Sequence, residues 1–244
     1  MKRKKLLFIC VCLISIFQLH GQSVTVIERN EAFEVSEKPK EFFYIEKEFP
    51  LTDDRRLATF EGLCANNQKS NLETLFYDFQ KTANEMGANA FFIEDFSIST
   101  DTIFVTVSIY HLTEKELDAN YELYPRNKIY VFGDLIASES KTKNPKSRAV
   151  KVNKEKIEIH PLSYYEYQSG IGEKVNINVG GVAGSSYTRK GESGKISVYL
   201  SLGGRTLRPV VSPMGGAGIS FSNGNIYPLD LNFGQFLAEI LKER

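Results

Sequence analysis

The stretch Leu57–Tyr110 constrains the fold most, because every local signal in it indicates the same order of elements: strand, helix, strand, strand. Its centre is an amphipathic helix whose apolar residues recur at helical spacing and form one stripe. These residues are Leu72, Leu75, Phe76, Phe79, Ala83 and Met86. Ser70-Asn71-Leu72-Glu73 fits a capping box at the start of the helix. Gly87 follows the stripe, where helix ends favour a residue that tolerates positive φ.

The segments around this helix have the composition of strands. Arg56–Cys64 precedes it, and Ala90–Ile98 and Thr102–Tyr110 follow, joined by a tight turn at Ser99-Thr100-Asp101. Thr102–Tyr110 alternates apolar and hydroxyl residues, which is typical of a strand with two different faces. Because a strand–helix–strand unit is normally a right-handed parallel crossover, we expect a small mixed sheet that covers the helix stripe.

Shorter elements flank this unit. Val24–Ile27 and Phe42–Ile45 are candidate strands of an N-terminal arm. Thr113-Glu114-Lys115-Glu116 repeats the capping-box pattern and predicts a helix to about Asn120, with Leu117 and Tyr121 turned inward. Ile129–Phe132 has the composition of a further strand.

The second half of the chain differs in composition from the first. Of the 18 glycines in the full sequence, fourteen lie between Gly170 and Gly234. Glycine at this density marks turns between short strands. The expected strands are Ala149–Val152, Lys156–His160, Lys174–Val179, Lys195–Leu200, Thr206–Val211 and Gly218–Phe221, with a hairpin turn at Asn223-Gly224. The pattern is typical of a β-sandwich or partial barrel.

The C-terminus is a second amphipathic helix, and its apolar residues again follow helical spacing. They are Phe233, Phe236, Leu237, Ile240 and Leu241. This helix either docks on its own protein or presents its apolar face to a partner or a membrane surface.

The sequence therefore predicts an α+β protein in two parts. Residues 22–136 form a small mixed βαββ domain with an N-terminal arm, and residues 149–244 form a Gly-rich, mostly antiparallel, β-sandwich-like domain with a C-terminal helix. Residues 137–148, rich in Ser, Lys, Thr and Asn, have the composition of a linker. The alternative is a long exposed hairpin loop within one continuous domain.

Residues 1–21 have the pattern of a signal peptide, with the positive run Lys2–Lys5, the apolar run Leu6–Leu19 and the small residue Gly21. We expect an exported protein, periplasmic or secreted, that begins near Gln22 and has no transmembrane span in its mature chain. An uncleaved anchor is the alternative, although the apolar run is short for a spanning helix.

Removal of this peptide changes the charge and the cysteine count. The full chain has 30 basic and 30 acidic residues, and loss of four basic residues leaves a net charge of −4. A mildly acidic chain without a basic run argues against a nucleic-acid partner. Only Cys64 remains of the three cysteines, so the mature chain forms no internal disulfide.

Cys64 is the first candidate for chemistry. It ends a strand shortly before a helix N-terminus, where a thiolate can be stabilised. The mature chain has two histidines, His111 and His160, so a cysteine-dependent hydrolase or transferase with a Cys–His pair is one hypothesis. The other is a structural cysteine, because cysteine is among the most buried residue types.

No metal site and no cofactor are predicted. A zinc site needs three or four ligands, whereas His111 and Glu114 are a single loose pair. Gly191-Glu192-Ser193-Gly194-Lys195-Ile196 contains Gly-Lys, but Ile196 stands where a phosphate loop needs a hydroxyl.

Tyr164, Tyr165 and Tyr167 are candidate binding residues. Tyrosines on a β-domain can stack on sugar rings or anchor a protein partner, which gives a glycan-binding module as a further hypothesis. The alternative is that some of them are buried in the core and the others edge the sheet.

Met86-Gly87-Ala88-Asn89-Ala90 followed at once by the strand Phe91–Ile93 resembles small α/β modules of bacterial envelope proteins, of the YbjQ and RcsF kind. The resemblance covers about Leu57–Tyr110 and implies a fold and an envelope setting. RcsF-type modules carry disulfides and the mature chain has one cysteine, so no functional residue is transferred. Together these observations predict a non-enzymatic binding or scaffolding protein, with an envelope protein or a glycan as partner.

Overall fold

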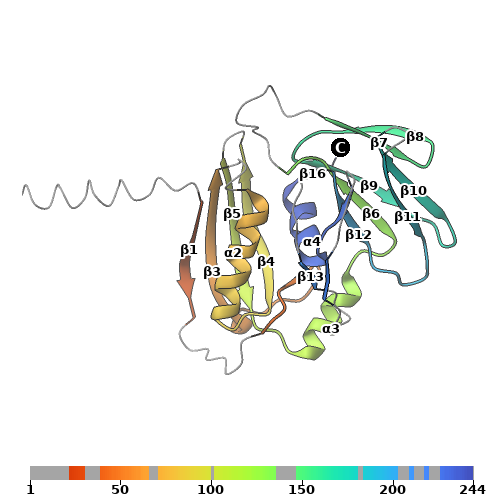
Figure 1. The fold of residues 1–244 in the computed structure, drawn as a ribbon. Coiled ribbons are helices and arrows are strands. Elements are labelled where there is room, and N and C mark those ends of the chain that lie inside the picture. Colours follow the sequence, from red (N-terminus) through yellow and green to blue (C-terminus); the bar gives the residue numbers. More distant parts are fainter. Residues whose placement is uncertain are drawn as a thin grey trace, which may run out of the picture.

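The computed structural model describes residues 22–30, 39–65, 71–99, 102–135, 147–180, 184–202, 209–211, 217–219 and 226–243. The expected signal peptide, Ser70, most of the expected linker and the Asn223-Gly224 turn lie outside these residues. The described chain has an α+β fold, as predicted, in which helices lie between two sheets and a further sheet covers the second of these (Figure 1).

Sheet 1 contains the strands of the N-terminal half. Its order is β1 (Gln22–Arg29), β3 (Arg56–Ala65), β5 (Thr102–Tyr110), β4 (Ala90–Ile98) and β2 (Phe43–Tyr44). Strands β3 and β4 are both antiparallel to β5 and therefore parallel to each other, whereas β2 pairs parallel with β4. The predicted crossover thus has the expected strand direction, but the hairpin strand β5 inserts between its two strands.

Helix α2 (Leu72–Glu85) covers one face of sheet 1 with its apolar stripe, which is buried as expected. Its cap lies one residue later than predicted, because Asn71 Oδ1 accepts hydrogen bonds from the backbone N–H groups of Glu73 and Thr74. Thr74 Oγ1 in turn accepts from Asn71 N at 3.0 Å. Gly87 ends the helix with a φ of +86°, which confirms the predicted need for glycine.

The short helices also follow their capping signals. A 3-10 turn η1 (Asp53–Arg55) precedes β3, and α3 (Glu114–Leu123) begins at the predicted Thr113 capping box. Tyr121, however, is 40% exposed, and the side chain buried from this helix is Asn120. The prediction that Tyr121 turns inward was wrong, because Asn120, three residues after Leu117, lies on the inward face and has buried hydrogen-bond partners.

Two further sheets come mainly from the second half. Sheet 2 has the order β15 (Tyr227–Pro228), β12 (Val198–Ser201), β6 (Lys128–Phe132), β9 (Ser163–Gln168) and β16 (Lys242–Glu243). Sheet 3 has the order β11 (Ser185–Lys190), β10 (Lys174–Val179), β7 (Arg148–Val152) and β8 (Glu155–Ile159). A separate hairpin pairs β13 (Pro209–Val211) with β14 (Ala217–Ile219).

Strands β9 and β11 were not predicted. Their sequences, SYYEYQ and SSYTRK, lack the alternation of aliphatic residues that marked the other strands. They are strands because they pair along their length, β9 with β6 and β11 with β10. The β6–β9 pairing joins segments that are distant in the chain and leaves little trace in the local pattern, whereas β11 forms a hairpin with β10 in which its polar residues hide the strand.

Both faces of sheet 2 are buried, which explains the continuous apolar run in β6. Tyr130 and Phe132 belong to a core shared with sheet 1, α2 and α4 (Leu231–Ile240). Ile129 and Val131 face a second core, formed with sheet 3. Helix α4 is itself buried, so the structure confirms that it docks on its own protein.

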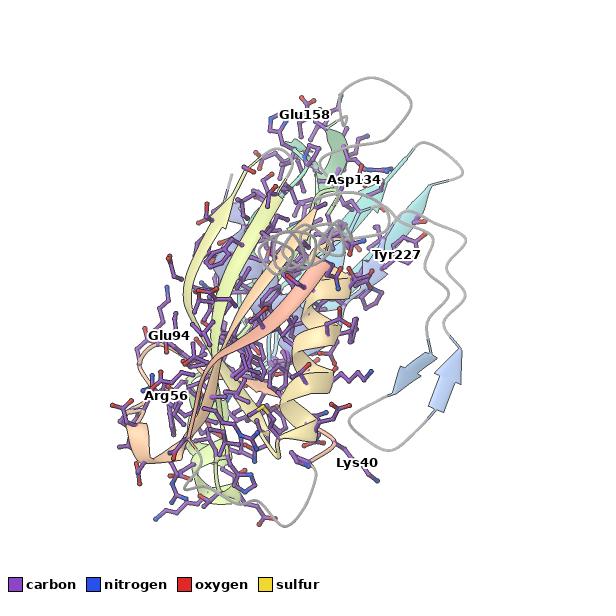
Figure 2. All side chains as sticks on the ribbon, turned by 90° about the vertical axis from the view of Figure 1, so that its left-hand side faces the viewer. Lys40, Arg56, Glu94, Asp134, Glu158 and Tyr227 are labelled. Atoms are coloured by element: carbon purple, nitrogen blue, oxygen red, sulfur yellow. The ribbon has the colours of Figure 1, made fainter. Side chains whose placement is uncertain are left out.

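The structure also connects the two predicted parts. Strand β6 precedes the predicted linker, yet it pairs with β9 and β12, which follow the linker. Arg148, at the end of the linker, donates from Nε and Nη2 to the two carboxylate oxygens of Asp134, each at 3.1 Å. Asp134 lies at the same end of the molecule as Glu158 of sheet 3 (Figure 2). The two-domain division stays a prediction, but sheet 2 takes strands from both sides of the boundary.

Candidate functional site

Cys64 lies on the face of β3 that packs against α2 and is fully buried. Burial raises the pKa of its thiol to about 12. At neutral pH the group is therefore a protonated, inaccessible thiol rather than a nucleophile.

The structure does not bring either histidine to Cys64. Cys64 is opposite Ile103 in the sheet, whereas His111 follows Tyr110, which is opposite Arg56 at the other end of β3. Eight residues of strand separate the two ends by about 27 Å. His111 Nδ1 lies 2.8 Å from the Gly87 carbonyl oxygen, and His160 is exposed at the end of β8 in sheet 3.

We expect a maleimide reagent at neutral pH to leave Cys64 unmodified in the folded protein and to modify it completely in denaturant. An Ile171→Cys variant is the matched control, since Ile171 is 77% exposed and its replacement should label at once. Labelling of folded wild-type protein as fast as that of the introduced cysteine would contradict the burial of Cys64.

The three tyrosines do not form one binding face. Tyr164 packs against the core shared with sheet 1, and its ring centroid lies 5.6 Å from that of Phe132. Tyr165 and Tyr167 pack against the core between sheets 2 and 3. Tyr167 also donates from its hydroxyl to Glu173 Oε1 at 2.6 Å. Alternation along β9 thus divides the tyrosines between two covered faces of sheet 2.

A buried polar cluster joins the edge of sheet 1 to α3 and α4. We call it the β2 junction and define it as Tyr44, Glu46, Asn120, Tyr124, Gln235 and Glu239. The Tyr44 carbonyl accepts from Asn120 Nδ2 at 2.7 Å and from the Tyr124 hydroxyl at 2.6 Å. The backbone N–H of Glu46 donates to Asn120 Oδ1 at 2.9 Å. Side chains thereby satisfy backbone groups that an edge strand would otherwise leave unpaired.

Glu46 is the carboxyl group of the junction whose pKa is raised. Gln235 Nε2 donates to Glu46 Oε1 at 3.1 Å, whereas the buried Oε1 of Gln235 has no hydrogen-bond partner within the described part of the chain. The pKa of the Glu46 carboxyl is raised to about 7, mainly by burial; the neighbouring carboxylates of Glu48 and Glu239 also raise it, whereas the Gln235 hydrogen bond and Lys47 lower it. Such groups mark candidate functional positions.

Sequence reasoning missed the β2 junction. Its members come from three elements up to 195 residues apart, as in the 3.4 Å hydrogen bond from the Tyr44 hydroxyl to Glu239. Two signals were available: Asn120 falls on the helical stripe of Leu117, and Gln235 lies within the apolar run of the last helix. A polar side chain on a buried face requires a partner, but the pattern does not say which.

A small polar cleft of about 250 Å³ opens near the start of β3, far from Cys64. Arg56, at the lower end of sheet 1 in Figure 2, lies on its wall. Its Nη2 is 3.6 Å from Glu28 Oε1 and 3.8 Å from Asp53 Oδ1. Both carboxylates are largely exposed, so these ion pairs contribute little to stability.

The opposite edge of sheet 1 is different from the β2 edge. Strand β1 has eight residues, and within the described chain it pairs only with β3. Val26 is 41% exposed and Ile27, the extra residue of a bulge, is 50% exposed. Figure 2 shows β1 (salmon) in front of the rest of sheet 1, beside α2. A long edge with exposed apolar residues is a template for pairing with another chain.

Among the described residues there is no cluster of three or more His, Cys, Asp or Glu side chains that could bind a metal ion. Within the same residues, no helix has the length and apolar character needed to cross a membrane. In comparisons with protein-family models, curated proteins and solved structures, nothing matches this chain.

Proposed function

We propose that this protein is a non-enzymatic binding or scaffolding component of the cell envelope, which captures an extended segment of a partner protein by adding it to strand β1. The observation that supports the proposal is the β1 edge, which no other strand of the described residues pairs with, and on which Val26 and Ile27 are exposed. The export pattern of residues 1–21 and the resemblance of Leu57–Tyr110 to envelope modules supply the setting. The arrangement as a βαββ domain and a β-sandwich-like domain joined by a linker belongs to the same proposal.

The chemistry of β1 suits an extended protein segment better than a glycan. An edge strand offers alternating N–H and C=O groups, which a partner strand satisfies in register. Residues 22–27 carry no charge, and Glu28 and Arg29 stand together at one end. The exposed side chains of Val26 and Ile27 can then contact apolar residues of the added strand.

The contrast between the two edges of sheet 1 strengthens this argument. At β2, the backbone N–H of Tyr44 donates to Asn232 Oδ1, and its carbonyl accepts from Asn120 and Tyr124. Side chains of α3 and α4 therefore occupy the positions that a partner strand would need. Within the described chain, β1 has no equivalent cover.

The test places a photo-cross-linking residue at Ile27 of the protein expressed in its own cells, with the same residue at Ile171 as a control. We expect the Ile27 position to trap one polypeptide that Ile171 does not trap, and the added Val26→Lys substitution to abolish this product. Lysine at Val26 is compatible with folding, because this side chain is already 41% exposed. It protects edge strands from pairing.

Three outcomes would overturn the proposal. The first is an Ile27 product that is identical to the Ile171 product or insensitive to Val26→Lys. The second is a product that consists of two copies of this chain, which would make β1 a self-association edge. The third is no product at Ile27 while the variant folds and is exported like the wild type.

A further inference from the structure

The strongest remaining feature is the contact between Glu46 and Gln235 in the β2 junction. It joins the segment after the edge strand of sheet 1 to a helix 189 residues away. Helix α4 lies between sheet 1 and sheet 2, with Phe233 and Phe236 in the core that both sheets share. Any change in this contact therefore acts on the helix that holds the two sheets together.

The Gln235 side chain has one satisfied and one unsatisfied end. Its Nε2 donates to Glu46 Oε1 at 3.1 Å, and its Oε1, although buried, accepts no hydrogen bond from any described residue. An ionised carboxylate cannot satisfy an amide oxygen, because both groups only accept. A protonated carboxyl can: it accepts the amide N–H on one oxygen and donates its own O–H to the amide oxygen. This cyclic acid–amide pair would satisfy both ends of Gln235.

The charges around Glu46 also favour its protonated form. Helix α4 contributes the neutral Gln235 and the acidic Glu239. Helix α3 contributes Asn120 and Tyr124, and strand β12 contributes Tyr199, all neutral at physiological pH. Within its own segment Glu46 has Tyr44, Lys47 and Glu48 as neighbours. Lys47 Nζ is 2.7 Å from Glu239 Oε1, so its charge is directed mainly to that carboxylate.

We propose that Glu46 and Gln235 form a proton-dependent latch, in which the protonated carboxyl holds α4 against the edge of sheet 1 and the ionised carboxylate loosens it. The proposal is independent of the proposed binding function. It commits to a direction: α4 is held most tightly in acid.

The direction of the pH dependence follows from the coupling between proton binding by Glu46 and the docking of α4. The carboxyl binds its proton more tightly when α4 is docked, with a pKa of about 7 against 4.5 when solvated. The stabilisation is fully present below about 4.5 and is lost as the pH rises through about 7. Opening that fully solvates Glu46 would become about 25-fold more favourable between about pH 5.5 and about pH 8.

The test is hydrogen exchange of the α4 amides, Leu231–Ile240, measured across this pH range and corrected for the intrinsic rate. We expect the opening equilibrium of the wild type to rise about 25-fold. Glu46→Gln should abolish the rise, because the introduced amide stays neutral at every pH and can form the same cyclic pair with Gln235. Glu41→Gln is the matched control, since Glu41 is exposed in the same segment and is not among the charges that shift the pKa of Glu46; its variant should retain the rise.

A Glu46→Gln variant that keeps the wild-type pH dependence would overturn the proposal, and so would a wild type whose α4 exchange does not change with pH. Carbon-detected NMR titration of the Glu46 carboxyl gives a second, independent readout on the wild type. A midpoint near 7 supports the latch, and a midpoint near the ordinary value of 4.5 overturns it even if the variant fails to fold.

Discussion

Replacing Phe76 with alanine should lower the free energy of unfolding by about 3–5 kcal/mol, the cost of a large cavity in a packed core. Phe76 is 2% exposed, and it is an aromatic residue through which α2 contacts α4. Its ring centroid lies 5.1 Å from that of Phe233 and 5.3 Å from that of Phe236. It also contacts the ring of Phe91 in sheet 1, at 5.7 Å. Truncation therefore removes contacts to both sheet 1 and α4 at once.

Urea denaturation followed by circular dichroism would measure this loss as a lower midpoint with an unchanged m-value. Phe96→Ala is the matched control, because the same atoms are removed from a side chain that is 39% exposed; its cost should be below about 1 kcal/mol. Equal losses in the two variants would show that the ring cluster around Phe76 is not the connection between the halves. Two separate unfolding transitions in the wild type would contradict the shared core.

Replacing Gly234 with alanine should destabilise the protein by about 2 kcal/mol or more, even though alanine is the better helix former by about 1 kcal/mol. A Cβ atom at position 234 would lie 2.2 Å from Cγ and 2.4 Å from Cβ of Tyr199. These atoms belong to the base of a buried side chain on β12, which cannot rotate away. Helix α4 would have to move off sheet 2 to make room.

Thermal unfolding would be measured for Gly234→Ala and for Ala238→Gly, a change one turn later in the same helix. Comparing their losses of stability separates the effect of the clash with Tyr199 from the effect of helix propensity. Ala238→Gly should cost about 1 kcal/mol through propensity alone. Gly234→Ala should cost more than this despite its favourable propensity. A Gly234→Ala variant as stable as the wild type would show that α4 does not approach Tyr199 this closely.

The sequence alone was sufficient for the elements that depend on neighbouring residues. The stripes of α2 and α4, the Thr113 capping box, the β4–β5 hairpin and the strands β7 and β8 were all predicted. Helical spacing, capping and alternation operate over a few residues, so the chain carries these signals locally. The burial of Cys64 agrees with the second of the two hypotheses for this residue, a structural cysteine.

The candidate site could not be predicted in the same way. Glu46 lies in a segment crowded with glutamate and lysine, where nothing distinguishes it from Glu41 or Glu48. Its raised pKa depends mainly on its burial in the folded protein, and its hydrogen-bond partner Gln235 lies 189 residues later. The exposure of β1 was equally hidden, since an edge strand and a central strand can have the same alternation.

What the sequence by itself determined is the α+β class, the three α-helices of the described residues and the strands with regular apolar alternation, because helix and strand periodicities are properties of short segments. Only the tertiary structure decided that β6 joins sheet 2, that α4 lies between the sheets, and that β1 and β2 are opposite edges with different cover. These features depend on pairing and packing between distant segments. Their free energy arises from burial and hydrogen bonds that exist only when the whole chain is folded.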